Sequence, residues 1–218
     1  MKALPNTAPT LSRPSPPLEL RFAVDGPGDA AASFIPSPEL GEWARTCFLD
    51  DDGPLFNAEH GHLRLASILF VWTNVPKAKN GREIWAEARL IRTAGDKWAQ
   101  GMSLQQLRQW NDGALPDFLI TVDAPSAAAM DDPTFGALVD HELYHCSIKL
   151  DENGTPDLGE DGNDPAWTMR GHDVEQFVGV VRRWGARASG VAELVAAAGQ
   201  PPLIEGAAIV RACGTCRG

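Results

Sequence analysis

The sequence predicts an α+β fold, in which a small mixed or antiparallel sheet packs against helices from later in the chain. Two observations predict this fold. Apolar segments of strand length come first, at residues 65–72, 82–91 and 117–123. Segments with apolar residues at three- and four-residue steps follow from Asp132 onward. Strands followed by helices, without regular alternation, are typical of α+β domains.

Caps and turn residues predict the elements of the first half. A helix over residues 38–49 begins with Ser37 as N-cap and Pro38 at its first position. The turn-rich residues 74–81 join the first two strands, and a short helix at residues 103–110 precedes the third strand. The next helix has Asp132 as N-cap and Pro133 at its first position, and its apolar face predicts burial: Phe135, Leu138, Val139 and Leu143.

The acidic and glycine-rich residues 151–164 lack periodicity and predict a solvated loop, because their spacing does not match a calcium-binding EF-hand loop. An amphipathic helix follows, opened by His172 and capped by Gly185. Its apolar stripe comprises Val174, Phe177, Val178, Val181 and Trp184. A short last helix covers residues 190–198.

Length and composition indicate a single folded domain over residues 38–200, between two tails. The proline-rich residues 1–37 predict a flexible N-terminal arm, which is either a solvated tail or a docking segment for a partner. Residues 201–218 form a C-terminal tail that carries Cys213 and Cys216. This pair is half of a zinc knuckle that a dimer would complete, or two thiols in a disordered tail.

Charge and hydropathy exclude several classes of function. A net charge of −10 opposes nucleic-acid binding, which requires clustered Lys and Arg. No stretch approaches the ~20 apolar residues of a membrane helix, so no membrane association is expected. The first residues lack a signal-peptide pattern, and four cysteines are too few for a disulfide framework. These features predict a soluble protein of the cytoplasm, in a bacterial cell or a phage-infected host.

The most informative motif is His141-Glu142-Leu143-Tyr144-His145. Two histidines four residues apart lie on one face of a helix, where both rings can bind one zinc ion. Glu142 then lies beside the metal, where it can take a proton from the zinc-bound water and return it to the leaving amine. Cys146 and Tyr144 are expected to point away from the metal and to serve packing.

A catalytic zinc site needs a third protein ligand, and His172 is the favoured candidate. Glu175 is the alternative ligand, and Asp173 is a further carboxylate that can either bind zinc or hold a histidine ring. His60 and His62 lie in a polar stretch before the first strand and are not assigned to the site.

Two segments resemble the family of putative phage metallopeptidases and, more distantly, SprT-like and other minimal zincins. They are residues 137–146, ALVDHELYHC, and residues 171–177, GHDVEQF. The resemblance implies a minimal zincin fold, with a sheet edge that pairs with extended peptide, the motif helix and a helix with the third ligand. The family pattern usually has an acid pair after the third ligand, and Gln176 departs from it.

Together these features predict a zinc-dependent metallopeptidase that binds one zinc ion through His141, His145 and His172. Glu142 is its catalytic residue, and its substrate is a protein or peptide. The alternative is a non-hydrolytic zinc protein of phage or prophage origin that serves structure or protein interaction. A chance motif in a protein without metal is a third interpretation. The sequence does not predict an oligomeric state.

Overall fold

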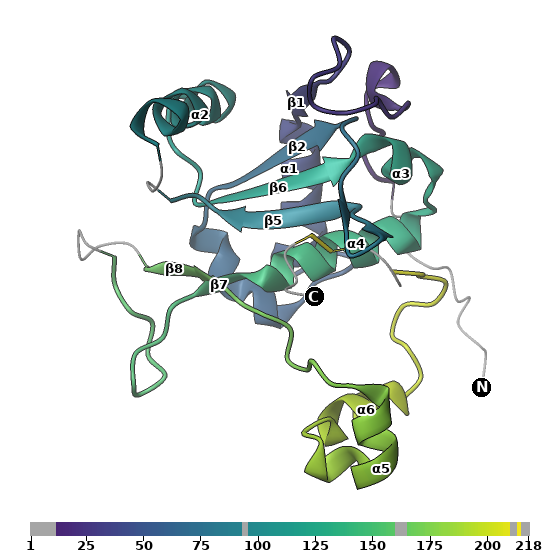
Figure 1. Cartoon of the computed structure of the whole chain (residues 1–218). Coiled ribbons are helices and arrows are strands. Elements are labelled where there is room, and N and C mark those ends of the chain that lie inside the picture. The colour runs from purple at the N-terminus through teal and green to yellow at the C-terminus, as the bar shows by residue number, and fades with distance from the viewer. Residues whose placement is uncertain (1–11, 93–95, 160–164, 210–212, 215–218) are drawn as a thin grey trace, which may run out of the picture.

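The computed structural model describes residues 12–92, 96–159, 165–209 and 213–214 (Figure 1). Its strands are β1 (Phe34–Pro36), β2 (Ile68–Thr73), β3 (Ala78–Lys79), β4 (Arg82–Glu83), β5 (Ala86–Leu90), β6 (Phe118–Asp123), β7 (Cys146–Ile148) and β8 (Trp167–Met169). Its α-helices are α1 (Pro38–Ala44), α2 (Lys97–Trp110), α3 (Ala124–Ala129), α4 (Asp132–His145), α5 (Val178–Ala188) and α6 (Ala192–Ala198). Shorter helical turns are η1 (Leu18–Leu20), η2 (Arg45–Leu49) and η3 (Ala58–Leu65).

A mixed four-stranded sheet organises the fold and confirms the α+β class. Its strand order is β1-β2-β6-β5. The central pair β2 and β6 is parallel, whereas β1 and β5 pair antiparallel with their neighbours. The pairs β3–β4 and β7–β8 form two separate hairpins. The order leaves β5 at an edge, next to the helix that carries the histidine motif (Figure 1).

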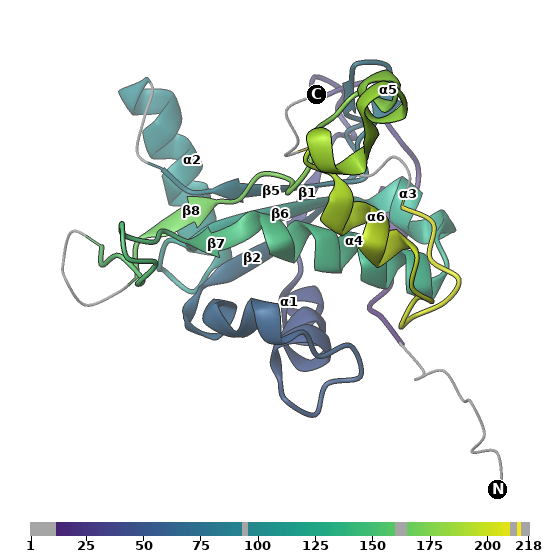
Figure 2. The same ribbon diagram turned by 90° about the horizontal axis from the view of Figure 1, so that it is seen from below.

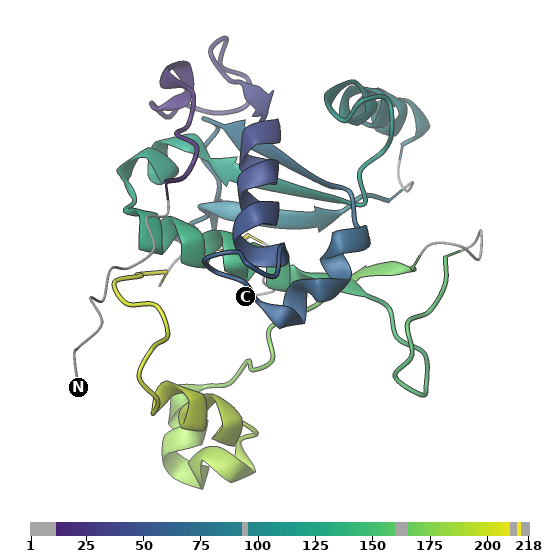
Figure 3. The ribbon, with the colours of Figure 1, turned by 180° about the vertical axis from the view of Figure 1, so that it is seen from behind.

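Side chains alternate between the two faces of the sheet, and both faces are covered. Phe70 and Trp72 of β2 and Ile120 of β6 belong to the main core, which α1 and α4 complete. Leu69, Val71 and Leu119 point to the other face and pack against α2. Seen from behind, α1 crosses the sheet on the main-core face (Figure 3). Because both faces of the sheet are buried, the sequence of β2 is a continuous run of apolar residues.

The predicted strand at residues 82–91 is divided in two. Arg82–Glu83 (β4) turns back on β3 through Asn80 and Gly81, whose φ angles are 51° and 73°. A two-residue Asn-Gly turn with positive φ is the preferred tight connection of a hairpin. The remainder becomes β5, which joins the main sheet. The predicted helix at residues 103–110 begins earlier, at Lys97, because Asp96 caps it by accepting from Trp98 N and Ala99 N.

Helix α4 carries the motif and is held in the core as predicted. Its N-cap is Asp131, one residue before the predicted Asp132, and the Asp131 carboxylate accepts from Thr134 N at 2.9 Å. The four residues of the predicted apolar face are at most 1% exposed: Phe135, Leu138, Val139 and Leu143. The helix ends at His145, and the chain continues directly into β7.

The N-terminal segment requires a correction. Residues 1–37 were expected to form a flexible arm, but from Arg13 onward the segment packs on the domain. Leu20 is 1% exposed, and Phe34–Pro36 forms β1 of the main sheet. The Arg13 guanidinium donates to Ala127 O at 2.9 Å and to Met130 O at 2.6 Å. Residues 1–11 lie outside the described part of the chain, and the division into domains stays a prediction.

The helix expected to carry the third ligand also requires a correction. Helix α5 begins only at Val178, so His172 lies in the preceding loop. Gly185 lies inside α5 at a kink with φ 83° and ψ 164°, instead of capping it. Phe177, Val178 and Trp184 of the predicted apolar stripe are exposed, whereas Val174 and Val181 are half-buried. The pair α5–α6 lies apart from the sheet (Figures 1 and 3).

Among the described residues, no helix has the length and apolar character to cross a lipid bilayer.

Arg13 is expected to stabilise the corner between α3 and α4. Its guanidinium donates two backbone hydrogen bonds, pairs with Asp132 at 3.0 Å and lies 4.3 Å from the centroid of the Phe135 ring. The substitution Arg13→Ala should lower the free energy of unfolding by about 2–4 kcal/mol, measured by urea denaturation. The control Arg182→Ala, at an exposed position of α5, should change it by less than about 0.5 kcal/mol. Equal effects of the two substitutions would contradict the role of Arg13.

Candidate metal centre

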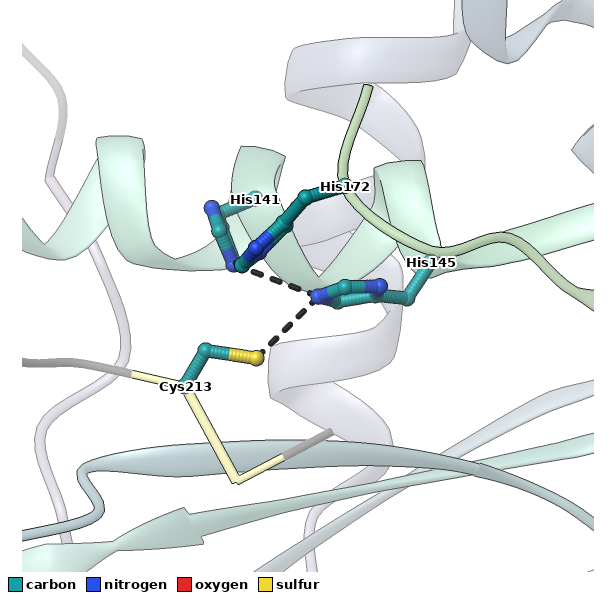
Figure 4. A group of neighbouring side chains, drawn as sticks. All are labelled: His141, His145, His172 and Cys213. Carbon is teal, nitrogen blue, oxygen red and sulfur yellow. Dashed lines mark hydrogen bonds between the residues drawn. The ribbon is translucent and has the colours of Figure 1, made fainter. Parts of the chain in front are cut away.

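Four side chains converge at the C-terminal end of α4. One ligand atom from each of His141, His145, His172 and Cys213 lies within 4.8 Å of the others (Figure 4). The first three are the residues that the sequence predicts as ligands. Cys213 comes from the C-terminal tail and was not predicted to belong to this site.

The two histidines of the motif are placed by the helix alone. Four residues separate them, so both rings leave the same face of α4, and their Nε2 atoms lie 3.2 Å apart. His145 is buried at 3% exposure, and His141 is half-buried at the surface of the helix. The intervening Leu143 and Glu142 point into the core, which anchors this turn of the helix.

His172 is brought to the helix by the β7–β8 hairpin, which the sequence did not predict. In that hairpin Cys146 pairs with Met169, so the next pair outward is His145 and Arg170. Arg170 N donates to His145 O at 2.9 Å, which continues the hairpin into the last residue of α4. His172 follows two residues later, and its Nε2 lies 3.3 Å from His141 Nε2. The view from below shows the hairpin extending from the end of α4 (Figure 2).

The contacts of His145 fix the orientation of its ring. His145 Nδ1 lies 2.7 Å from Arg170 O, and because a carbonyl only accepts, Nδ1 carries the proton. His145 Nε2 therefore directs its lone pair into the cluster, as is usual for a metal-ligating histidine. Burial, and next the neighbouring His145, lower the pKa of His172, while Glu175 and Asp173 oppose this shift.

The donor set suits a metal ion. With metal–nitrogen distances of about 2.0–2.1 Å, the nitrogen ligands of a tetrahedral site lie roughly 3.3 Å apart. The Nε2 separations of 3.2 and 3.3 Å agree with this value. Imidazole nitrogens and a thiol favour a late transition metal, whereas calcium and magnesium prefer oxygen ligands.

Glu142 lies on the sheet side of the cluster. It is fully buried, and its Oε2 accepts from Ala88 N on the edge strand β5 at 2.8 Å. Burial, and next the charge of Cys213, raise the pKa of Glu142 well above its usual range, while His145 and the Ala88 N–H oppose this shift. A metal cation held by the histidines would also favour the ionised carboxylate.

On the opposite, solvent side, the three histidines line a pocket of about 240 Å³. Tyr144 lines it too, although the sequence assigned this residue to packing. Its hydroxyl accepts from Asn57 Nδ2 at 2.9 Å and donates to Glu59 Oε1 at 3.2 Å. Asp173 accepts from Arg170 Nη2 at 2.6 Å, so it supports the Arg170 side chain. The rim of the pocket is therefore polar, and its side chains are joined by hydrogen bonds.

The remaining histidines lie outside the cluster and connect α4 to η3. His60 is 1% exposed, and its Nε2 lies 2.7 Å from Asp140 Oδ1, one residue before His141. His62 Nε2 lies 3.0 Å from Cys146 O. Cys146 is buried in the core, in agreement with the packing role predicted for it.

Two features of the site were missed by the sequence analysis, namely Cys213 and the contact of Glu142 with Ala88. The Cys213–Cys216 spacing was a signal of metal binding, but it was considered only as part of a separate zinc knuckle. Cys216 lies outside the described residues. Glu175, the alternative third ligand, is exposed and is not part of the cluster.

Comparison with known proteins adds one finding. A family model described as "Putative phage metallopeptidase" matches residues 41–199. This range includes α4 and the loop with His172, and it ends before Cys213. Comparisons with curated proteins and with solved structures gave no significant match. Since the family model covers most of the sequence, the chain belongs to the putative phage metallopeptidase family.

Proposed function

We propose that this protein is a zinc-dependent metallopeptidase with a minimal zincin-like fold, which hydrolyses peptide bonds of protein substrates in the cytoplasm. The observation that carries the proposal is the position of Glu142. Glu142 follows His141 directly on the helix, and its carboxylate accepts from Ala88 N at the edge of the sheet. Family membership supports the same class of activity.

His141, His145 and His172 would hold the zinc ion, which leaves one position for a water molecule or the substrate. Zinc in such a site supplies Lewis-acid chemistry, because it lowers the pKa of water and polarises a carbonyl group. Arg170 contributes by fixing the His145 ring through its carbonyl oxygen. Asp173 in turn holds the Arg170 guanidinium in place.

Glu142 acts as general base and then as general acid. Its carboxylate takes a proton from the attacking water, and the proton then passes to the amine of the departing peptide. The Ala88 N–H fixes one carboxylate oxygen, and the carboxyl group also interacts with Cys213 of the cluster. Burial raises the pKa of Glu142, and a bound cation would oppose this shift.

The edge strand β5 offers the binding surface for a peptide. It is the last strand of the sheet, and it contacts α4 directly through the Glu142–Ala88 hydrogen bond. An extended peptide can add to such an edge through main-chain hydrogen bonds, with little dependence on sequence. This geometry would place a substrate carbonyl between the histidines and Glu142.

A non-hydrolytic zinc protein is the second candidate, and Cys213 is the observation that favours it. With Cys213 the cluster offers four donors, which is the number found in structural zinc sites. Chelation separates the two candidates. A purely structural zinc should leave an unfolded chain on removal, whereas a catalytic zinc should leave a folded and inactive one.

His172 should be required for zinc binding, and Glu175 should not. His172→Ala removes one of three nitrogen donors. Loss of a residue that only hydrogen-bonds to a metal ligand weakens metal affinity by up to about 100-fold, so loss of the ligand itself should weaken zinc affinity by more than this. Glu175→Gln is the matched control and should bind zinc as the wild type does. Competition titration against a zinc indicator gives both affinities. A loss in Glu175→Gln with retention in His172→Ala would make Glu175 the third ligand.

Glu142→Gln should abolish cleavage and retain zinc. The amide cannot accept a proton, so the rate should fall by at least about 10²–10⁴-fold. The measurement uses an unfolded protein such as casein, in a Cys213→Ser background that removes the fourth donor. Glu152→Gln, in the exposed loop, is the control and should keep full activity. Stoichiometric zinc without Glu142-dependent cleavage would refute the peptidase and favour the structural zinc site.

A further inference from the structure

Cys213 occupies the place beside Glu142 where the proposed reaction needs water. Its Sγ lies 3.1 Å from His145 Nε2, and it also interacts with the Glu142 carboxylate. Figure 4 shows that it approaches from the side of the sheet, opposite to His172. The thiol therefore lies between the general base and the imidazoles.

The neighbouring Gly214 is bound to the edge of the sheet. Gly214 N donates to Ala86 O at 2.8 Å, and Cys213 forms a parallel bridge with Ala86. A Cβ atom at position 214 would lie 2.8 Å from Ile84 Cγ2 and 2.9 Å from Glu87 Cβ. Only a glycine can approach β5 this closely, because the Glu87 Cβ is attached to the backbone and cannot move aside.

These contacts use the edge of β5 that a peptide substrate would need. Trp85 O accepts from Asp123 N of β6, so in an alternating strand Ala86 and Ala88 present their polar groups outward. Ala86 O is bound by Gly214 N, and Ala88 N is bound by Glu142. The tail and the general base thus fill adjacent positions on this edge.

A second contact holds the tail upstream. Ala208 N donates to Thr134 Oγ1 at 3.1 Å, in the first turn of α4. The tail is therefore anchored near the start of the motif helix before it reaches the cluster at its end. Tethering of this kind gives the thiol a high effective concentration at the site.

From these contacts we infer that the C-terminal segment holds the enzyme in a latent state. Cys213 closes the fourth coordination position, and Gly214 occupies the peptide-binding edge. The inference rests on the proposed function, since it describes regulation of the same site. The segment blocks water and substrate together, so activation requires its release. Both residues lie beyond the range 41–199 matched by the family model.

The coordination is tested first, without any measurement of activity. The full chain is loaded with Co²⁺ in place of zinc, because a cobalt–thiolate bond gives a near-ultraviolet charge-transfer band. The wild type should show this band, Cys213→Ser should lose it, and the matched thiol variant Cys216→Ser should keep it. Absence of the band from the wild type, or its persistence in Cys213→Ser, would overturn the inference.

The closure is tested by competition with acetohydroxamate, a small ligand for the open position of a metal. It should bind cobalt-loaded Cys213→Ser about tenfold or more tightly than the wild type. Gly214→Val should give the same gain with the thiol still present, because its side chain clashes with Glu87. Gly28→Val, at a glycine with open space around it, should behave as the wild type does. Equal affinities in all four proteins would overturn the closure.

Cleavage of casein then separates this inference from the proposed function. Faster cleavage by Cys213→Ser and Gly214→Val than by the wild type supports latency. Equal cleavage by all three would refute latency and leave the peptidase intact. Absence of cleavage in every variant, together with the expected cobalt and hydroxamate results, would refute the peptidase and leave the closure of the site standing.

Discussion

The pairing between His145 and Arg170 is the constraint on which the candidate centre depends. Arg170 N donates to His145 O, and His145 Nδ1 donates back to Arg170 O. One residue pair thus fixes the position of the incoming loop and the orientation of a ligand ring. Because His172 follows two residues later, its distance from His141 is a consequence of this pairing. The hairpin between the two histidine segments is therefore part of the site.

The second organising interaction joins α4 to the sheet. Glu142 is a fully buried carboxylate whose ionised form is disfavoured by its surroundings. The Ala88 N–H offsets part of this cost, and a cation bound by the histidines would offset more. Metal binding and ionisation of Glu142 would thereby be coupled. Polar contacts from η3 support the other side of the helix, where His60 meets Asp140.

The same geometry would allow the proposed catalysis and the proposed latency to share one site. A peptide on this edge would need Ala86 O, which the C-terminal tail binds, and a water molecule would need the position beside Glu142 that the Cys213 thiol occupies. A tethered segment can therefore compete with substrate without any change in the fold. The exposed α5–α6 pair lies in the sequence between His172 and this tail, so it connects the two parts of the chain that meet at the site.

The sequence alone determined the class of the fold and the inner part of the site. Helix α4 was predictable because its cap, its period and its apolar face depend on local spacing, and His141, Glu142 and His145 followed from that helix. Its cap was misplaced by one residue, since Asp131 and Asp132 are equally suitable from sequence. Strands β2 and β6 were found because two covered faces produce continuous apolar runs, and β5 was found because its apolar and polar residues alternate.

Only the tertiary structure decided which distant residues complete the centre. His172 was chosen correctly as a member of the cluster but was placed on a helix, because an apolar stripe predicts a helix without showing where it begins. Cys213 and Ala88 join the site through strand pairing between segments far apart in the chain, and such pairing leaves no local periodicity. The ordering of residues 12–37 has the same cause, since β1 is defined by its partner β2. Local spacing determines which side chains lie on one face of a helix. Contacts between residues far apart in the sequence determine which segments pack against that face.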